Sequence, residues 1–268
     1  MQSRTSRFSG PELALLAPAA ERQRLAVITE ADREEDEMGL LGAGAMTAWC
    51  DVAVEAIPEF EDWHSHEHMP ERLAIPGFLR GTRWVAAADG PRYFLLYEVD
   101  AFDTLTSQPY LARLNDPTPW SKQMMGYVRN MTRGLCGVSG SFGFGIAQTL
   151  LTTRFSPADG RETVLRAWLT QEALPNLPET RGIIAAHLLE TRELPNLPQT
   201  QEQRIRGGDM TADWVVLVEG YDFESVISLS RTRLSVESLT ARSASPAQTT
   251  SVYQLAYSLT CQDTAHDG

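Results

Sequence analysis

Three histidines lie within one short stretch of this chain, residues 63–78, although the whole sequence contains only five. The stretch reads WHSHEHMPERLAIPGF. At about 100° per residue, Trp63, His64 and Glu67 share one face of a helix. Burying an imidazole and a carboxylate on an otherwise apolar face costs free energy unless the groups are paired. The spacing suits a proton-transfer site, whereas a solvated surface face is the alternative interpretation, above all for His66 and Glu71.

The helix that carries these residues is expected to run over Pro58–His68. Met69 and Pro70 should end or kink it, because the residue before a proline avoids the α region. His68 would then lie near the helix C-terminus, where the helix dipole favours the protonated imidazole. Pro76 and Gly77 are expected to form the turn into the next strand.

The elements expected around this helix follow the order β-α-β-β-α-β, which is the ferredoxin-like unit. The expected strands are Met46–Val54, Phe78–Ala88, Arg92–Val99 and Val128–Val138, and the other helices are Phe102–Leu114 and Trp120–Tyr127. After a glycine-rich linker over residues 137–145, the order recurs. The second set has strands Phe144–Phe155, Gly182–Arg192, Trp214–Gly220 and Thr249–Leu259, and helices Arg161–Leu174 and Phe223–Ser235. A long loop, Glu193–Thr211, is expected to lie over one end of the second sheet.

Matching residues indicate that the two halves arose by internal duplication. The matched pairs are Trp63 and Trp168, Glu67 and Glu172, Pro70 and Pro175, Gly77 and Gly182, Glu98 and Glu219, and Phe102 and Phe223. The first four pairs share one constant offset. The second half has Leu169, Gln171 and Ala173 in place of the three histidines. A purely structural role would be expected in both halves, so this difference places the site in the first half.

These residues resemble the dimeric α/β-barrel superfamily, and within it the EthD-like branch. The resemblance is carried by Trp63, Glu67-His68, Pro70, Arg72-Leu73, Pro76-Gly77-Phe78 and Arg83-Trp84 inside the β-α-β-β-α-β unit. It covers residues 45–133 directly and 144–260 through the duplication. It implies an α+β fold in which tandem duplicated ferredoxin-like units of one chain form a pseudo-dimeric α/β barrel. Relatives include cofactor-independent monooxygenases, polyketide cyclases, lactone isomerases and haem-handling proteins.

Four segments are expected on this basis. Residues 1–44 form an N-terminal extension, with a short helix in Pro11–Arg24 and an acidic run over residues 30–37. Residues 45–138 form the first ferredoxin-like repeat, which carries the site. Residues 144–260 form the second, degenerate repeat, and residues 261–268 form a tail.

The chemistry implied is that of an enzyme acting on a small apolar or aromatic carbonyl compound, of monooxygenase, cyclase, isomerase or lyase type, without an organic cofactor. His68 would be the general acid or base, because its reference pKa of about 6.5 suits proton transfer. Glu67 would orient or polarise an imidazole, or hydrogen-bond the substrate. Arg72 or Arg83 would stabilise an enolate or oxyanion; the alternative for both arginines is a salt-bridged support for the sheet edge. The expected pocket walls are Trp63, His64, Phe78, Arg83, Trp84, Phe94 and Tyr97. Ordinary core packing is the alternative for each aromatic residue.

Three other functions compete with this interpretation. His64 and His68, with Glu67, have the i, i+4 spacing of a metal site, but His66 points elsewhere and the zinc-protease pattern is absent. Either His64 or His68 could serve as an axial haem ligand. A non-catalytic scaffold that binds a small molecule is the third alternative. We predict neither a metal nor a bound cofactor.

The composition of the chain argues against two classes of binding partner. The net charge of −12 argues against nucleic acid and anionic membranes, since both need a basic surface. No apolar run approaches the roughly 18 residues of a membrane span. Cys50, Cys136 and Cys261 are odd in number and far apart, which favours buried thiols in a reducing cytoplasm. The analogy with two-chain barrels allows further association into a homodimer.

Overall fold

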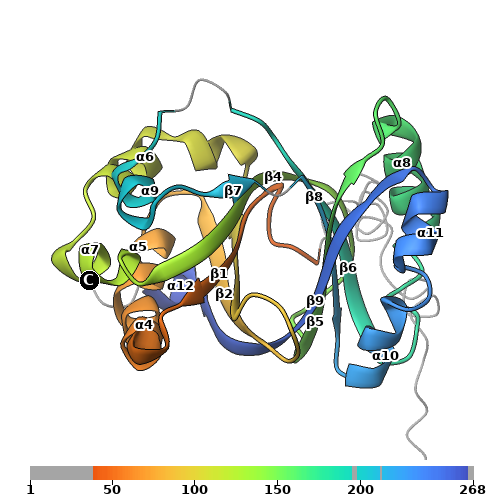
Figure 1. The fold of residues 1–268 in the computed structure, drawn as a ribbon, viewed down its shortest axis with the longest axis horizontal. Coiled ribbons are helices and arrows are strands. Elements are labelled where there is room, and N and C mark those ends of the chain that lie inside the picture. The colour runs from red at the N-terminus through yellow and green to blue at the C-terminus, as the bar shows by residue number, and fades with distance from the viewer. Residues whose placement is uncertain (1–38, 195–197, 212, 265–268) are drawn as a thin grey trace, which may run out of the picture. The chain divides into compact units, whose positions relative to one another are not determined.

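A closed ring of eight antiparallel strands organises the computed structural model, which describes residues 39–194, 198–211 and 213–264 (Figure 1). The expected helix Pro11–Arg24 and the acidic run over residues 30–37 lie outside the described residues. Around the ring the strands are β1 (Gly44–Val52), β3 (Tyr93–Val99), β2 (Phe78–Ala86), β9 (Ala244–Thr260), β5 (Thr149–Pro157), β8 (Trp214–Gly220), β6 (Ile183–Thr191) and β4 (Val128–Gly143). Pairing of β4 with β1 closes the ring.

Each half of the chain contributes four strands, connected in the expected β-α-β-β-α-β order. The first half adds the helices α4 (Ile57–Trp63), α5 (Met69–Leu73), α6 (Gln108–Asn115) and α7 (Pro119–Met125). The second adds α8 (Glu162–Trp168), α9 (Gln201–Arg206), the short strand β7 (Met210–Thr211), α10 (Phe223–Leu229), α11 (Val236–Ala241) and, at its end, α12 (Cys261–Thr264). The strand orders are β4-β1-β3-β2 and β9-β5-β8-β6. Figure 1 shows α4 to α7 with α9 on one side of the barrel, and α8, α10 and α11 on the other.

Two long strands join the halves. The first part of β4 pairs with β1, and its last part pairs with β6 of the second half. Strand β9 pairs first with β5 and then with β2. The glycine-rich segment over residues 137–145 is therefore strand as far as Gly143, and its interpretation as a linker was wrong. Glycine is poor in intrinsic strand preference, but hydrogen bonding to β6 overrides that preference here. The following strand begins at Thr149 rather than at Phe144.

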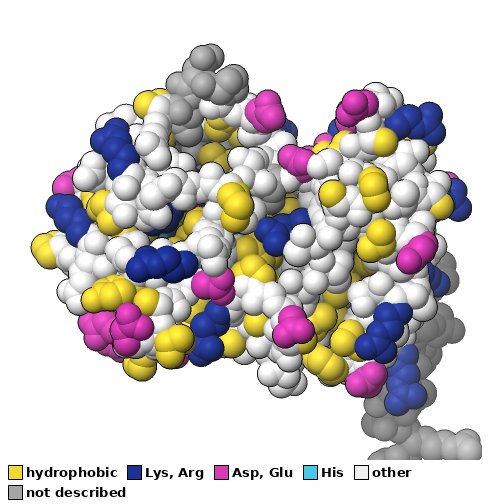
Figure 2. All heavy atoms as spheres, in the orientation of Figure 1, with side chains coloured by type: hydrophobic (Ala, Val, Ile, Leu, Met, Phe, Trp, Pro, Cys, Tyr) yellow, Lys and Arg dark blue, Asp and Glu magenta, His cyan; other side chains and the backbone are white. Residues whose placement is uncertain are grey.

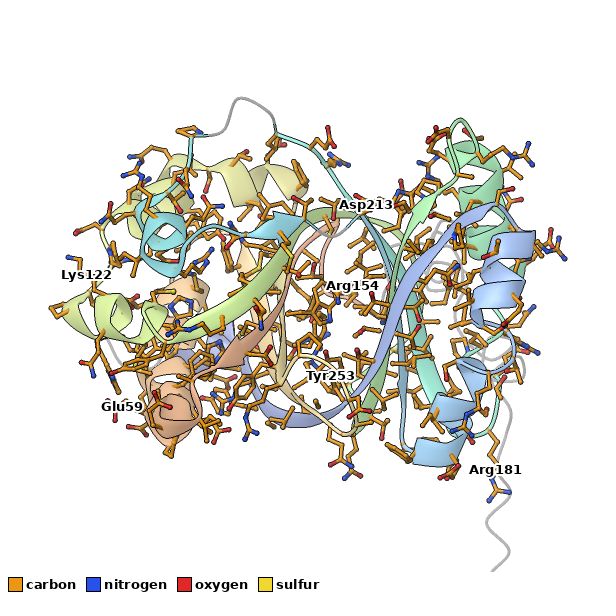
Figure 3. All side chains as sticks on the ribbon, viewed as in Figure 1. Glu59, Lys122, Arg154, Arg181, Asp213 and Tyr253 are labelled. Atoms are coloured by element: carbon orange, nitrogen blue, oxygen red, sulfur yellow. The ribbon has the colours of Figure 1, made fainter. Side chains whose placement is uncertain are left out.

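Strand periodicity sorts the side chains into two layers, because successive residues point to opposite faces. The barrel interior is filled by a cluster that includes Trp49, Trp84 and Phe94. Figure 3 shows Tyr253 and Arg154 between the two groups of helices, and the Arg154 guanidinium lies 4.6 Å from the centroid of the Trp49 ring. The outer face of each half-sheet packs against its own helices and forms a separate apolar core.

The helix that carries the three histidines does not end at His68. It continues from α4 through one π-helical turn, His64–His68, into α5. Proline has no N–H to bond the carbonyl of His66, and the wider turn adapts to this by letting Met69 N–H donate to the carbonyl of His64. The second half repeats the arrangement in the π-helical turn Leu169–Ala173, where Leu174 N–H donates to the carbonyl of Leu169 at 3.0 Å.

The turn after this helix requires glycine. Gly77 has φ +90°, and a Cβ there would lie 2.7 Å from both Asp100 Oδ1 and Thr104 Oγ1. We expect Gly77→Ala to lower the free energy of unfolding by about 2 kcal/mol, from left-handed strain together with this crowding. Urea unfolding measures the loss.

The matched control for the turn is Gly160→Ala. Gly160 also has a positive φ, +68°, but a Cβ there would have no neighbour within 4 Å. Its expected loss is about 1 kcal/mol, from backbone strain alone. Equal losses in the two variants would show that the crowding at Gly77 is relieved by small shifts and costs nothing.

Charges of both signs are spread over the surface. Figure 2 shows Lys and Arg side chains interspersed with Asp and Glu on one face of the molecule. Within the described ranges, no helix is long and apolar enough to cross a membrane.

Candidate functional site

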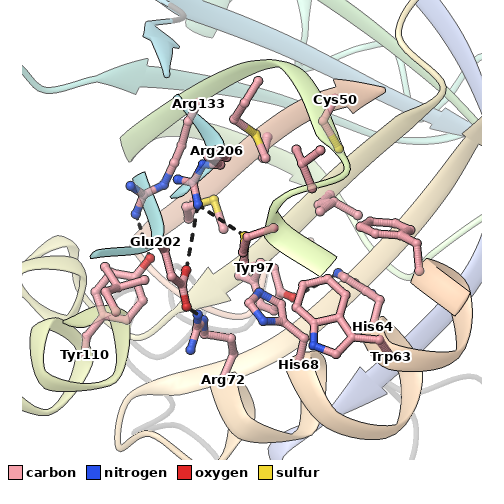
Figure 4. A pocket seen from close by; sticks show the side chains of 18 residues that line it. Cys50, Trp63, His64, His68, Arg72, Tyr97, Tyr110, Arg133, Glu202 and Arg206 are labelled. Carbon is pink, nitrogen blue, oxygen red and sulfur yellow. Dashed lines mark hydrogen bonds and ion pairs between the residues drawn. The ribbon is translucent and has the colours of Figure 1, made fainter. Parts of the chain in front are cut away.

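A cavity of about 40 Å³ lies in the first half, between the outer face of its sheet and its helices (Figure 4). Strands β1, β3 and β4 form its floor, and Glu202 and Arg206 of α9, from the second half, form part of its wall. Its apolar lining comes from Met46, Ala48, Cys50, Phe60, Trp63, Leu95, Leu114, Met125, Val128 and Met131. Its polar lining comes from His64, His68, Arg72, Tyr97, Tyr110, Arg133, Glu202 and Arg206.

His64, His68 and Arg72 reach this cavity from successive turns of one helix. Their spacing of four residues keeps the three side chains on one face, even across the π-helical turn. All three are buried, at 0%, 8% and 2% exposure. The strands supply alternate residues, such as Leu95 and Tyr97 of β3, because of their two-residue period.

His64 is held as a neutral imidazole by two neighbours. Its Nδ1 lies 3.4 Å from Arg83 Nη1, and its Nε2 lies 3.2 Å from Tyr97 Oη. A guanidinium can only donate, so Nδ1 accepts and the proton resides on Nε2, which donates to the tyrosine. Burial lowers the pKa of His64 well below its usual value, and the charges of Arg83 and Arg72 lower it further. His64 is therefore a fixed, uncharged group at neutral pH.

His68 differs from His64 in having a free nitrogen. Its ring centroid lies 4.4 Å from that of Trp63, and among the described residues Nδ1 has no hydrogen-bond partner. Burial, then Arg72, His64 and Arg206, lower the pKa of His68 well below its usual value. The expectation of a protonated imidazole at a helix C-terminus was wrong, because the helix continues and two guanidinium groups lie nearby. His68 is therefore an uncharged imidazole at neutral pH, with an Nδ1 that no described residue contacts by a hydrogen bond.

The charged wall of the cavity is a chain of arginines and carboxylates that crosses between the two halves. Arg72 Nη2 donates to Glu202 Oε1, and Glu202 Oε2 lies 3.8 Å from Arg206 Nη1. Arg206 in turn pairs with Asp209, with Nε 2.7 Å from Oδ1. Arg133 lies 3.8 Å from Asp209 and donates to Tyr110 Oη at 2.7 Å.

Glu202 and Arg206 belong to the segment that we expected over the second sheet, and that prediction was wrong. The segment crosses to the first half, where β7 pairs with β4 at Thr132 and Arg133 and Gln201 N–H donates to Asn115 Oδ1 at 3.1 Å. Its helix α9 opens with a capping box formed by Thr200 and Gln203. That Thr-x-x-Gln pattern was the one signal in the sequence that predicts a helix in this loop. Nothing in the sequence indicates which half the helix covers.

Glu67 does not line the cavity. Its Oε1 accepts hydrogen bonds from Trp63 Nε1 at 3.1 Å, Thr118 Oγ1 at 2.6 Å and Ser121 Oγ at 3.2 Å. Thr118 is the N-cap of α7, so Glu67 ties the histidine helix to the start of α7. In the described part of the chain no hydrogen bond joins Glu67 to an imidazole, and its contacts are those of a positioning residue.

The remaining residues proposed from the sequence occupy other surroundings. Trp84 points into the barrel interior with Phe94, on the opposite face of the sheet from the cavity. Phe78 packs in the helix-side core against Tyr97 and Tyr110, outside the cavity lining. Arg83 does not line the cavity; it donates to the carbonyl of Glu61 at 3.0 Å, and its Nη1 lies 3.4 Å from His64 Nδ1.

Of the two residues interpreted as surface, His66 is exposed and Glu71 is half-buried. The side chain of His66 is 71% exposed and pairs with Asp62 at 2.9 Å. Glu71 is half-buried and lies 3.3 Å from Arg113. Within the described ranges, no cluster of three or more His, Cys, Asp or Glu side chains could hold a metal ion.

Comparison with known proteins shows which solved structures share this fold. No family model and no curated protein matches the sequence. Three solved structures superpose on most of the chain. An anthrone oxidase-like protein has a TM-score of 0.58 at 10% identity, with 84% of this chain and 95% of the other covered. Monooxygenase-like proteins from Fusobacterium nucleatum (TM-score 0.54, 8% identity, 82% and 95% covered) and Lactobacillus acidophilus (0.53, 9%, 82% and 97%) follow. The chain shares the α+β barrel fold of these structures.

That fold agrees with the α+β barrel expected from the sequence. At such low identity the likeness extends to the fold alone, so the chemistry has to be argued from the cavity of this chain.

Proposed function

We propose that this protein is a cofactor-independent enzyme that removes a proton from a small apolar or aromatic carbonyl compound. The observation that carries the proposal is the state of His68, which is neutral and buried, lines the cavity, and has no hydrogen-bond partner at Nδ1 among the described residues. Arg72 lines the same cavity one helical turn further along the chain. A buried polar atom without a partner costs free energy, and such atoms in folded proteins call for an explanation.

The proposed step is a proton transfer. The free nitrogen of His68 takes a proton from the carbon next to the carbonyl, or from a phenol, and the substrate becomes an enolate or phenolate. Arg72 stabilises the negative charge that develops, because its Nη1 is buried and has no hydrogen-bond partner among the described residues. Trp63 and Leu95 supply apolar walls. An enolate of this kind is the common first intermediate for oxygenation, cyclisation, isomerisation and carbon–carbon cleavage, so the proposal covers these reaction types together.

We also infer that the two halves descend from one duplicated unit of the EthD-like branch, with repeats over residues 45–138 and 144–260. Three matched features support this. The π-helical turn recurs at the same offset as the sequence matches, Gly77 and Gly182 both have φ +90°, and Glu98 and Glu219 are both buried. Because π-helical turns are rare, their recurrence at matched positions of the two halves favours common descent over chance.

The test compares His68→Gln with His66→Gln. A thermal-shift screen against aromatic ketones, lactones and quinones first identifies a ligand, and turnover of that ligand is then measured. We expect His68→Gln to lower kcat by about 10²–10⁴-fold, the usual contribution of a general base. His66→Gln is expected to match the wild type, because His66 faces solvent.

The pH profile gives a second readout. The base works in its neutral form, so kcat/KM should stay constant through neutral pH and fall only well below pH 6.5, in line with the lowered pKa of His68. Full turnover in His68→Gln would remove His68 from the mechanism, whereas a profile that falls near pH 6.5 would show that the pKa of His68 is not lowered in the free enzyme.

A further inference from the structure

Glu202 occupies a position that a ligand would be expected to fill. It reaches into the cavity from α9, 130 residues along the chain from its partner Arg72, and both side chains are buried. The free cavity of about 40 Å³ is far smaller than the roughly 150 Å³ that a benzene-sized ligand fills. An aromatic substrate can enter only if a side chain now lining the cavity moves.

The pattern of ion pairs favours Glu202 as the side chain that would move. Arg206 and Arg133 both have Asp209 within ion-pair distance. In the described part of the chain, Glu202 is the one carboxylate paired with Arg72. A guanidinium that is 98% buried needs an anion beside it. Whatever displaces Glu202 from Arg72 must therefore itself be negatively charged.

A short movement suffices for the exchange. Glu202 already lies 3.8 Å from Arg206, so its carboxylate can leave Arg72 and remain paired. Meanwhile α9 stays anchored through the capping box, the Arg206–Asp209 pair and the bond from Gln201 to Asn115. The carboxylate thus bridges Arg72 and Arg206, and a shift towards Arg206 would vacate the anion site.

We propose that Glu202 is a built-in placeholder for the anionic group of the substrate, and that the cavity takes small aromatic compounds carrying a carboxylate. The anionic group binds Arg72, close to the free Nη1 of that guanidinium and the free nitrogen of His68. This inference rests on the proposed function, because it uses the same cavity, and it adds the substrate class. A neutral ligand of the same shape would leave Arg72 without an anion and would bind poorly.

Calorimetric titration with sodium benzoate and with benzamide tests this. The two probes have the same ring and differ in charge. We expect benzoate to bind Glu202→Gln at least about tenfold more tightly than the wild type, or about 1.4 kcal/mol, because the competing charge is gone. Benzamide affinity should change less than about twofold. The matched control is Glu190→Gln, which removes the carboxylate of the Arg166–Glu190 pair in the second half and should leave both affinities unchanged.

A second variant, Glu202→Asp, keeps the test informative if Glu202→Gln does not fold. Glu202→Asp keeps the charge but draws it back from Arg72, so its benzoate affinity should fall between those of wild type and the glutamine variant. The inference is overturned if benzoate binds the variants no more tightly than the wild type, if benzamide gains equally, or if no benzoate binding is seen. These measurements need no turnover, so their failure is separate from a failure of His68 as the base.

Discussion

Replacing Glu202 by alanine should lower the free energy of unfolding by about 3–5 kcal/mol, the usual cost of leaving a buried charge without its partner. The cost is high because Arg72 is 2% exposed and Glu202 is 3% exposed. Removing the carboxylate leaves the buried Arg72 guanidinium without the anion that offsets its lost hydration. Urea unfolding at pH 7 measures the change.

Two further variants separate the charge effect from simple loss of packing. Glu190→Ala breaks the pair with Arg166, whose side chain is 41% exposed, and should cost at most about 1 kcal/mol. The double variant Arg72→Met with Glu202→Leu should recover most of the loss, because apolar residues of similar size replace buried ion pairs at little cost. A loss below 1 kcal/mol in Glu202→Ala would mean that water hydrates Arg72, and the cavity would then not be enclosed.

The second large effect is expected from Glu219 in the barrel interior. Burial raises the pKa of Glu219 to about 7, an effect that Glu98 reinforces and the hydrogen bond from Ala147 N–H opposes. The folded state thus prefers the protonated carboxyl. Its stabilising contribution is fully present below the unfolded pKa, near 4.5, and is lost as the pH rises through 7. The loss amounts to about 3 kcal/mol, because each pKa unit corresponds to about 1.4 kcal/mol.

Glu219→Gln keeps an acceptor for Ala147 N–H and cannot ionise. At pH 8 we expect it to be about 3 kcal/mol more stable than the wild type, whereas at pH 4 the two should be nearly equal. Urea unfolding between pH 4 and 8 checks this, with the exposed Glu224→Gln as the control. Parallel pH profiles for wild type and Glu219→Gln would show that Glu219 ionises in the fold without cost.

His187 makes the acid side of the same profile steep. Burial, reinforced by Arg80, lowers the pKa of His187 to about 3. Its contribution is therefore present above pH 6.5 and is lost as the pH falls towards 3. Because Glu219→Gln leaves His187 in place, this acid limb should persist in the variant while the alkaline loss disappears.

Local patterns in the sequence were enough to find the histidine helix and its neighbours in the fold. Periodicity placed Trp63 and His64 on one buried face, and the element order around them gave the ferredoxin-like strand arrangement. Strand periodicity also predicts that the adjacent residues Arg83 and Trp84 lie on opposite faces of the sheet. A strand sends neighbours to opposite faces, so one pocket could not have both as walls. Their separation was therefore predictable from the sequence.

The charged wall of the cavity was not predictable. Arg72 and Glu202 are 130 residues apart, and no periodicity or composition links positions that meet only through tertiary structure. The lowered pKa of His68 could not be predicted from the sequence either. It depends on burial and on the guanidinium groups of Arg72 and Arg206, which the tertiary structure brings close to His68. The π-helical turn was signalled only by Pro70, which the usual rule interprets as a helix end.

Because all eight strands of the ring come from one polypeptide, the two halves do not have to be identical. In an assembly of two identical chains, every substitution and every insertion appears twice, and a loop that covers one pocket covers both. Here the crossing segment with α9 contributes to the cavity wall of the first half. In the second half, the buried apolar residues Leu169 and Ala173 stand at the positions of His64 and His68. One half can thus be selected for reactivity and the other for support, by mutations that each affect the barrel in one place.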